Sequence, residues 1–463
     1  MKMSLLTILI TSWLLSCNKG TPTPTPVTPP VTPPVVTAPA QYGTPFSQVP
    51  VPADAVIYQV NTRAFSAGGK LQGVTERLDS IKALGVNVIY LMPVYPVGTT
   101  NAVNSPYCIK DYSSVAAEYG SLSDLRNLVS AAHDRNIAVI MDWVANHTSW
   151  DHPWISSNKS WYAQNAAGTI ISPPNTGWND VAQLNFSNQD MRKAMIAAMK
   201  SWIYNANIDG YRCDAADFVP ADFWKQAIDS LRAINTHQLL LFAEGTRNDH
   251  FNAGFQMEYG MGFFYNLKNR IFGQGGSVQS IDSVNTVEYT NAPSQAQVVR
   301  YTTNHDVNLT DGTPEELFGG NNGSITSFMV ACYMKGIPMI YNGQEIGYNV
   351  RLNYFNNSTP ITWTTNSSVT NAYKQLLAFR KSSNALKNGA LSSYSSNDVC
   401  VFTKTSGNEK VLVLANMRNS NMNYNAPAAI ANSNWKNAFG NGETVAVGTQ
   451  VPLAPYQYIV LKN

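Results

Sequence analysis

The chain has 463 residues, which by the usual size of a domain is enough for two or three domains. Its 31 basic and 29 acidic residues leave a formal net charge of +2, and charged residues make up 13% of the chain. An average soluble protein has about 25%. This balance excludes the basic surface that nucleic-acid binding requires, so we expect no nucleic-acid partner.

Residues 1–17, "MKMSLLTILITSWLLSC", have the pattern of an export signal. Lys2 precedes an apolar run that is too short to span a bilayer and is typical of a secretory signal peptide. The run ends in Leu-Leu-Ser-Cys, which resembles the bacterial lipobox, so we expect Cys17 to be lipidated. The alternative is an ordinary signal peptide with a chance cysteine. The lipobox interpretation predicts an exported protein, held by lipid in a bacterial envelope membrane at the cell surface or on the periplasmic face.

Residues 18–50 are rich in proline and threonine, as in "GTPTPTPVTPPVTPPVVTAPA" at 20–40. Such a composition cannot build a core and favours the extended polyproline conformation. We expect a linker between the lipid anchor and the folded part of the chain.

The remaining cysteines have neither CxxC pairs nor metal-ligand spacing. They are Cys108, Cys213, Cys332 and Cys400. Their spacing argues against a zinc site. An exported protein can form disulfides, so the sequence leaves their pairing open. Cys213 lies in a predicted central strand, where we expect a small core residue.

From residue 51 onward, short apolar runs alternate with amphipathic segments, as in repeated β/α units. Seven such runs are predicted as strands, at 56–60, 87–93, 138–144, 209–215, 239–245, 300–306 and 338–345. An eighth, weaker run lies near "GFQMEYG" at 254–260. Eight units predict a (β/α)8 TIM barrel over residues 51–386. An open doubly wound sheet is the alternative, but no glycine-rich phosphate loop follows the first strand.

Two further regions complete the predicted α/β architecture. Residues 147–186 are too long for an ordinary loop after the third strand and are predicted to form an inserted, protruding subdomain. Residues 387–463 change to alternating strands with a Ser-Gly-Asn turn at 406–408, which predicts a C-terminal antiparallel β-sandwich domain.

Three carboxylates follow predicted barrel strands. Asp214 ends the fourth strand, Glu244 the fifth and Asp306 the seventh, so all three should meet at the C-terminal mouth of the barrel. Carboxylates placed close together raise one another's pKa. Such a cluster can hold one proton donor beside one ionised nucleophile near neutral pH.

Arg212 lies two residues before Asp214 and therefore on the same face of the strand. We expect its positive charge to keep Asp214 ionised; a structural ion pair without a chemical role is the alternative. His147 and His305 are predicted at two further strand ends, where neutral imidazoles could donate hydrogen bonds to a ligand.

Four motifs, in order and with the expected spacing, resemble those of the alpha-amylase family of retaining glycoside hydrolases. They are "DWVANH" at 142–147, "GYRCDAA" at 210–216, "AEG" at 243–245 and "TNHD" at 303–306, joined by "GIPMIYNGQE" at 336–345. The resemblance covers residues 51–463. It implies an alpha-glucan as the partner that the site binds.

The resemblance also implies a role for each residue of the site. It implies Asp214 as nucleophile, Glu244 as general acid/base, Asp306 as transition-state stabiliser, and Tyr107, His147, Arg212 and His305 as sugar-binding residues. In the family a His-Gly pair precedes the tyrosine, whereas this chain has Ser105 and Pro106.

Members of the family that bind calcium beside the insert use residues that this chain only partly retains. Asn146 is present, but Asn185 stands in the position of an aspartate and Phe218 in that of a histidine. We therefore expect no required cofactor, with calcium at this site as the alternative and Asn146 as the one metal-ligand candidate.

The activity that the resemblance implies is endo-type hydrolysis of alpha-1,4 bonds in starch-like polysaccharides or maltooligosaccharides. Alternatives are a cyclomaltodextrinase- or neopullulanase-type hydrolase, a transglycosylase, and an inactive glycan-binding protein on the same fold. The complete carboxylate set favours an active enzyme. Four tryptophans in the insert could line further sugar subsites or pack in a core: Trp150, Trp154, Trp161 and Trp178.

Overall fold

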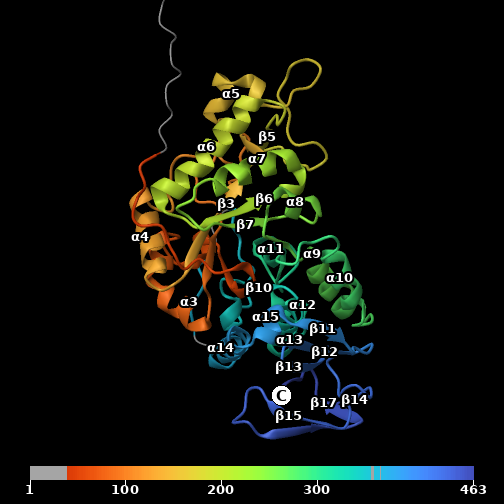
Figure 1. Cartoon of the computed structure of the whole chain (residues 1–463). Helices are drawn as coiled ribbons and strands as arrows, with labels where there is room; N and C mark the ends of the chain where they lie inside the picture. The colour runs from red at the N-terminus through yellow and green to blue at the C-terminus, as the bar shows by residue number, and fades with distance from the viewer. Residues whose placement is uncertain (1–38, 356–358, 365) are drawn as a thin grey trace, which may run out of the picture. The chain divides into compact units, whose positions relative to one another are not determined.

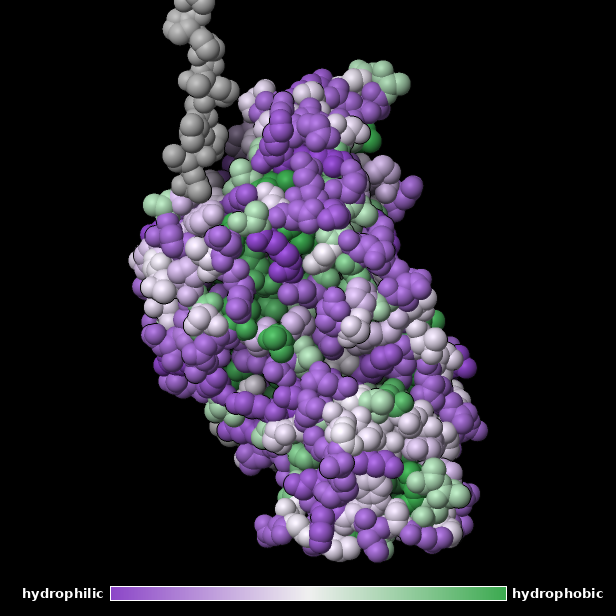
Figure 2. Space-filling model, viewed as in Figure 1, coloured by the Kyte–Doolittle hydropathy of each residue, from purple (hydrophilic) through white to green (hydrophobic). Residues whose placement is uncertain are grey.

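The structure is a computed structural model, which describes residues 39–355, 359–364 and 366–463. The predicted signal peptide, the lipidation site at Cys17 and most of the predicted linker lie outside the described residues. Across the described residues, no helix combines the length and the apolar character needed to cross a bilayer. The face shown in Figure 2 is mostly hydrophilic.

A closed barrel of parallel strands forms the centre of the described chain (Figure 1). Within the described residues its strands are β1 (Ile57–Val60), β2 (Val88–Leu91), β3 (Ala138–Val144), β6 (Gly210–Asp214), β7 (Leu240–Ala243), β8 (Met257–Tyr259), β9 (Gln297–Arg300) and β10 (Ile337–Tyr341). Each barrel strand pairs with the next barrel strand along the chain, and β10 closes the barrel on β1. The predicted (β/α)8 class is confirmed, and the weak eighth signal corresponds to β8.

Helices follow the strands and pack around the barrel. Within the described residues they are η1 (Pro52–Asp54), α1 (Thr62–Phe65), α2 (Leu71–Glu76), α3 (Leu78–Leu84), α4 (Leu122–His133), α6 (Gln189–Ala206), η3 (Ala216–Phe218), α7 (Ala221–Arg232), α8 (Asp249–Ala253), α9 (Met261–Tyr265), the π-helical η4 (Asn266–Gly273), α10 (Ser280–Glu288), α11 (His305–Thr310), α12 (Pro314–Leu317), α13 (Gly320–Tyr333), η5 (Gln344–Ile346), α14 (Ser367–Ser382) and α15 (Asn384–Asn388). The strands are almost entirely buried, as expected for parallel strands covered on both faces.

Local sequence explains where these elements begin. Helix α4 starts at a capping box, in which Ser121 and Asp124 each bond the other's backbone N–H. Strand β6 starts at Gly210, where φ is +140° and a Cβ atom would lie 1.9 Å from the carbonyl oxygen of Leu240. Glycine is required there because β6 and β7 approach too closely for a side chain.

The insert after β3 contains a small antiparallel ladder. Its elements are β4 (His147–Ser149), α5 (Pro153–Ser157), η2 (Lys159–Trp161) and β5 (Val181–Gln183). Strands β4 and β5 pair antiparallel, with His147 opposite Gln183. His147 therefore begins the insert's own strand rather than ending β3.

The C-terminal region is antiparallel, as predicted. Its six-stranded sheet has the order β11 (Ala390–Ser393), β12 (Val399–Ser406), β13 (Glu409–Asn416), β18 (Tyr458–Lys462), β15 (Ser433–Asn437) and β16 (Thr444–Val447), and a second sheet pairs β14 (Met422–Asn425) with β17 (Gln450–Leu453). Side chains alternate along β12: Val401 packs in the core between these sheets, whereas Cys400 and Phe402 pack in the cluster shared with the barrel.

The seventh barrel strand differs from its prediction. Strand β9 ends at Arg300, and Asp306 lies in the first turn of α11 rather than at a strand end. The Asn304 side chain explains the change, because it accepts hydrogen bonds from the backbone N–H groups of Asp306 and Val307 and so starts the helix. His305, predicted at the same strand end, is the first residue of α11.

Within the described residues, the cysteines at 108, 213, 332 and 400 are buried free thiols. Cys213 is 1% exposed in β6, which agrees with the core role expected for it.

Candidate active site

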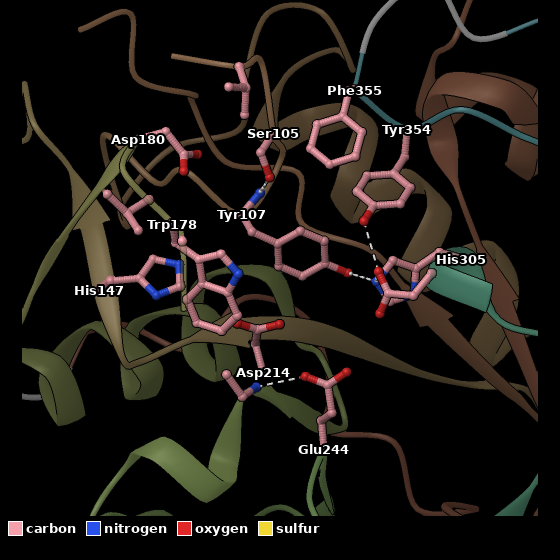
Figure 3. Close-up of a pocket in the computed structure, with 15 residues that line it drawn as sticks. Ser105, Tyr107, His147, Trp178, Asp180, Asp214, Glu244, His305, Tyr354 and Phe355 are labelled. Carbon is pink, nitrogen blue, oxygen red and sulfur yellow. Dashed lines mark hydrogen bonds and ion pairs between the residues drawn. The ribbon is translucent and has the colours of Figure 1, made fainter. Parts of the chain in front are cut away.

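A cavity of about 420 Å³ contains the carboxylates predicted from the sequence (Figure 3). Its lining residues are Val103, Ser105, Tyr107, His147, Gly177, Trp178, Asp180, Val181, Asp214, Ala215, Glu244, His305, Asp306, Tyr354 and Phe355. Six of the seven residues predicted for the site line the cavity, and the seventh, Arg212, is buried in contact with Asp214 and Glu244. A volume of this size suits a small part of an extended ligand.

Arg212 is fully buried and binds carboxylates from three neighbouring strands. Its Nη1 atom donates to Asp142 Oδ1 at 2.8 Å and to Asp214 Oδ1 at 2.9 Å, while Nη2 lies 2.5 Å from Glu244 Oε1. The last contact has the distance of an ion pair but not the alignment of a hydrogen bond. Asp142 and Arg212 are direct partners in the register of β3 and β6, which places both side chains on one face.

Glu244 is held against the backbone that follows Asp214. Its Oε2 atom accepts from the backbone N–H of Ala215 at 2.8 Å. Ala215 has φ of +44°, a left-handed conformation that is unfavourable for any residue with a Cβ atom. This strain, at a residue that touches Glu244 directly, is typical of a functional site.

Burial dominates the electrostatics of the carboxylates. It raises the pKa of Asp214 well above its usual value; Arg212 lowers that pKa, whereas Glu244 and Asp142 raise it further. Burial also raises the pKa of Asp142 to about 6, again against the effect of Arg212. The expected influence of Arg212 on Asp214 is therefore present, but the desolvation of the buried Asp214 carboxyl outweighs it, and Arg212 also interacts with Asp142 and Glu244.

A continuous hydrogen-bonded chain runs from Gln59 to Asp142 through two residues that line the cavity, His305 and Tyr107. His305 Nδ1 contacts Gln59 Nε2 at 2.8 Å, and His305 Nε2 contacts Tyr107 Oη at 2.7 Å. Tyr107 Oη donates in turn to Asp142 Oδ2 at 3.1 Å. Burial lowers the pKa of His305 to about 3, so this imidazole is neutral at ordinary pH.

His147 lies on the side of the cavity formed by the insert. Asn146 Oδ1 accepts from Gln183 Nε2 at 3.0 Å, which turns its Nδ2 atom towards His147 Nδ1 at 3.2 Å. The ring proton of His147 then belongs on Nε2. Burial lowers the pKa of His147 to about 4, so it too is a neutral donor.

Asp306 has a partner that the sequence did not indicate. Tyr354 Oη donates to Asp306 Oδ1 at 2.8 Å. Arg63 fixes the loop that carries Tyr354, because its Nη1 atom donates to the carbonyl oxygens of Tyr354 and Phe355 while Nη2 pairs with Glu118 at 2.8 Å. Surrounding protein atoms raise the pKa of Asp306, but its side chain is 45% exposed to the open cavity, where solvent reduces this effect.

Trp178 is the tryptophan of the insert that lines the cavity. It is 36% exposed, packs edge-on against His147 and lies 5.4 Å from the ring of Phe218. Trp154 and Trp161 pack against each other instead, and Trp150 donates to the carbonyl oxygen of Asn179.

Sequence analysis missed Asp142, Tyr354 and Phe355. Asp142 had a usable signal, because it is the first residue of the motif "DWVANH" and ends up opposite Arg212. Tyr354 and Phe355 lie in a loop beyond β10 that has no periodic pattern, so only their contacts reveal them.

The residues at the family's calcium position do not fit a calcium ion. Asn146 Oδ1 is occupied by Gln183, Asn185 Oδ1 accepts from the backbone N–H of Ser187, and Phe218 has no ligand atom in its side chain. No carboxylate remains among these positions, whereas calcium prefers several charged oxygen ligands. Within the residues that the structure describes, no cluster of three or more His, Cys, Asp or Glu could hold a metal ion.

Chelation by EDTA is therefore expected to leave both activity and thermal unfolding midpoint unchanged. The measurement compares the enzyme before and after exhaustive dialysis against EDTA. A loss of activity or of the midpoint that calcium restores, and magnesium does not, would contradict this expectation.

Comparisons with known proteins agree with the barrel fold and with an assignment to a known family. A family model described as alpha amylase, catalytic domain, matches residues 53–362. Alpha-amylase 3 of Dictyoglomus thermophilum is 25% identical over 442 residues, which cover 80% of this chain and 86% of that protein. A cyclomaltodextrin glucanotransferase of Klebsiella oxytoca is 25% identical over 87% of this chain and 73% of that protein.

The fold is shared with solved structures. The crystal structure of an alpha-amylase from Lactobacillus plantarum has a TM-score of 0.79 and 24% sequence identity, over 89% of this chain and 99% of that chain. Barrel, site and matches together define an enzyme of the glycoside hydrolase type. The chain belongs to the alpha-amylase family.

Proposed function

We propose that this enzyme is a retaining endo-hydrolase of alpha-1,4-glucosidic bonds in starch-like polysaccharides or maltooligosaccharides. The observation that supports it most is the convergence of Asp214, Glu244 and Asp306 on one cavity, with Arg212 buried in contact with the first two. A glycan-binding protein without activity would not need this complete set.

In the proposed first step, the protonated carboxyl of Glu244 donates its proton to the glycosidic oxygen. The bond from the anomeric carbon to that oxygen breaks while a carboxylate oxygen of Asp214 bonds to the same carbon. The leaving sugar departs as an alcohol. Glu244 is left as a carboxylate and the glycosyl group as an ester on Asp214.

In the second step, water gives a proton to Glu244 and attacks the anomeric carbon. The ester bond breaks, Asp214 is released as a carboxylate and Glu244 is protonated again. Two displacements at one carbon retain its configuration. Asp306 carries negative charge beside the oxocarbenium-like transition state, which it stabilises electrostatically.

Arg212 orients Asp214 and offsets part of the charge of the carboxylate cluster. His147 and His305 remain neutral because burial lowers the pKa of each, to about 4 and about 3 respectively. Neutral imidazoles can donate to sugar hydroxyls without adding positive charge. Tyr107 and Trp178 offer ring faces for the apolar faces of glucose units.

A second candidate is transfer of the glycosyl group to another sugar or ring opening of cyclodextrins. The similarity to a cyclomaltodextrin glucanotransferase supports this candidate activity. The same ester intermediate could be attacked by a sugar hydroxyl instead of by water.

A product profile on starch, pullulan and cyclodextrin distinguishes these activities. Endo-hydrolysis predicts a rapid loss of starch viscosity before many reducing ends appear, with little action on cyclodextrin. Faster turnover of pullulan or cyclodextrin than of starch, or products longer than the substrate, would contradict endo-hydrolysis as the main activity. Absence of turnover on all three would contradict the enzyme assignment.

We also propose that Cys17 anchors the enzyme in a bacterial envelope membrane by lipidation, a role that is supported by the lipobox-like sequence before it. A Cys17→Ser variant is expected to move from the membrane fraction to the soluble fraction, because serine cannot receive the lipid. Several acyl chains together anchor a protein stably, so their loss should release it. Fractionation followed by an activity assay measures the shift. A variant that stays in the membrane fraction as fully as the parent would show that another feature holds the protein there.

A further inference from the structure

Gln59 is a fully buried polar residue inside the barrel that the proposed mechanism does not use. It lies in β1, opposite Tyr90 of β2 and Tyr341 of β10. Within the described residues, its Oε1 atom has no hydrogen-bond partner. An unpartnered buried oxygen lowers stability, so an apolar residue would suit the packing better. A glutamine at this position therefore requires an explanation, and in the described part of the chain the one hydrogen-bond partner of its amide nitrogen is His305 Nδ1.

The hydrogen bonds beyond His305 determine which way the proton of its ring faces. Asp142 Oδ2 accepts from Tyr90 Oη at 2.7 Å, and both Asp142 oxygens accept from Arg212. As an ionised carboxylate, Asp142 can only accept, so the single hydroxyl proton of Tyr107 is directed to Asp142. The oxygen of Tyr107 then accepts from His305 Nε2, which must carry the ring proton.

The other ring nitrogen follows by the same reasoning. Neutral imidazole has one proton, so Nδ1 of His305 is an acceptor and needs a donor. Gln59 Nε2, at 2.8 Å, supplies it. With the amide of Gln59 reversed, Nδ1 would hold the proton, and the oxygens of Tyr107 and Asp142 would face each other at 3.1 Å without a proton between them. That alternative is unfavourable whenever Asp142 is ionised.

We propose that Gln59 is a positioning residue, which holds the proton of His305 on Nε2 by donating its side-chain amide to Nδ1. Nε2 is the nitrogen on the side of the cavity, since it contacts Tyr107 and lies 3.4 Å from Asp306 Oδ1. In the structure this N–H donates to Tyr107 Oη, and an entering sugar hydroxyl would share it as a second acceptor. Its consequence for activity rests on the sugar-binding role proposed above for His305, whereas the proton position does not.

The first test measures the proton position in the unaltered enzyme. Selective ¹⁵N labelling of its six histidines allows the two ring nitrogens of each to be distinguished by NMR, and loss of one signal pair in His305→Asn assigns His305. We expect an unprotonated Nδ1 and a protonated Nε2 from pH 7 to pH 8, where Asp142, with its pKa of about 6, is ionised. The charged or titratable groups near His305 are Tyr107, Asp306, Arg212, Glu244 and Tyr354. A proton on Nδ1 would overturn the proposal.

Two variants test whether Gln59 is the cause. Gln59→Glu places an acceptor beside Nδ1, so Nδ1 should become protonated and His305 should titrate at a higher pH than in the parent. Gln59→Leu should retain or raise the unfolding midpoint, because it removes a buried unpartnered oxygen, and should lower kcat/KM about tenfold through loss of one oriented hydrogen bond. Unchanged His305 signals in Gln59→Glu would overturn the proposal, and a kcat/KM within twofold of the parent in Gln59→Leu would overturn its consequence for activity.

Tyr58→Phe is the matched control in the same strand. Tyr58 precedes Gln59, points the other way and donates to Glu345 Oε1 at 2.6 Å. Its loss should lower the unfolding midpoint while the His305 signals stay as in the parent. If the control shifted the His305 signals as Gln59→Glu does, general damage to β1 would explain the result and the specific role of Gln59 would be wrong. A product profile other than that of endo-hydrolysis would contradict the proposed function. It would leave the NMR result for the proton position of His305 unchanged.

Discussion

Asp214→Asn is expected to lower turnover on the order of 10⁴-fold or more, on every substrate, whatever the leaving group. The amide cannot form the glycosyl ester, so the first step is blocked even when the leaving group is an acidic phenol that needs no protonation. Burst and steady-state release of phenol from an aryl alpha-maltooligoside measure this directly. We expect neither a burst nor sustained release.

Asp222→Asn is a suitable control for this substitution. Its carboxylate is largely exposed on α7 and pairs with Arg192, away from the cavity. The control should retain parental activity. Near-parental turnover of Asp214→Asn on the activated substrate would contradict the nucleophile assignment, and the pair of Arg212 and Asp214 would then be a structural ion pair.

Glu244→Gln is expected to lose activity in a manner that depends on the leaving group. On starch, turnover should fall by about 10²- to 10⁴-fold, because the glycosidic oxygen is a poor leaving group without a proton donor. On an aryl glycoside with an acidic phenol, the first step should survive while hydrolysis of the ester is slow. The variant should therefore release a burst of phenol equal to the enzyme concentration.

Azide provides the second half of this test. As an anionic nucleophile it needs no general base, so it should restore turnover of Glu244→Gln on the aryl glycoside and yield a glycosyl azide of retained configuration. Asp214→Asn should gain nothing of this kind. Equal loss on starch and on the activated substrate, with no burst and no effect of azide, would show that Glu244 is not the acid/base.

The barrel could be predicted from the sequence because parallel strands covered on both faces give continuous apolar runs. The run around β3 is seven buried residues long and unmistakable, whereas β8 has three residues and leaves a weak signal. The end of β9 was misplaced, because the sequence after Arg300 continues with residues that favour strands. The side chain of Asn304 caps the N-terminus of α11 there, so the chain forms a helix instead of continuing the strand.

The site was predictable to the extent that its residues follow barrel strands. Asp214 is the last residue of β6 and Glu244 directly follows β7, so their positions along the chain give their positions in space. The partners of the other two site residues come from elsewhere: Gln59 of β1 contacts His305, and Tyr354, in an aperiodic loop beyond β10, donates to Asp306. The pKa of Asp214 could not be predicted either, since it depends on burial and on how many carboxylates share Arg212.

The glycosyl ester on Asp214 is the central claim of this account, and peptide mapping can detect it. Glu244→Gln would be mixed with the aryl maltooligoside, quenched in acid during the slow second step, digested and examined by mass spectrometry. We predict a mass increase equal to the transferred glycosyl group on the peptide that contains residues 210–218, located on Asp214 by fragmentation. An adduct on another residue, or a burst of phenol without any adduct on that peptide, would contradict the account.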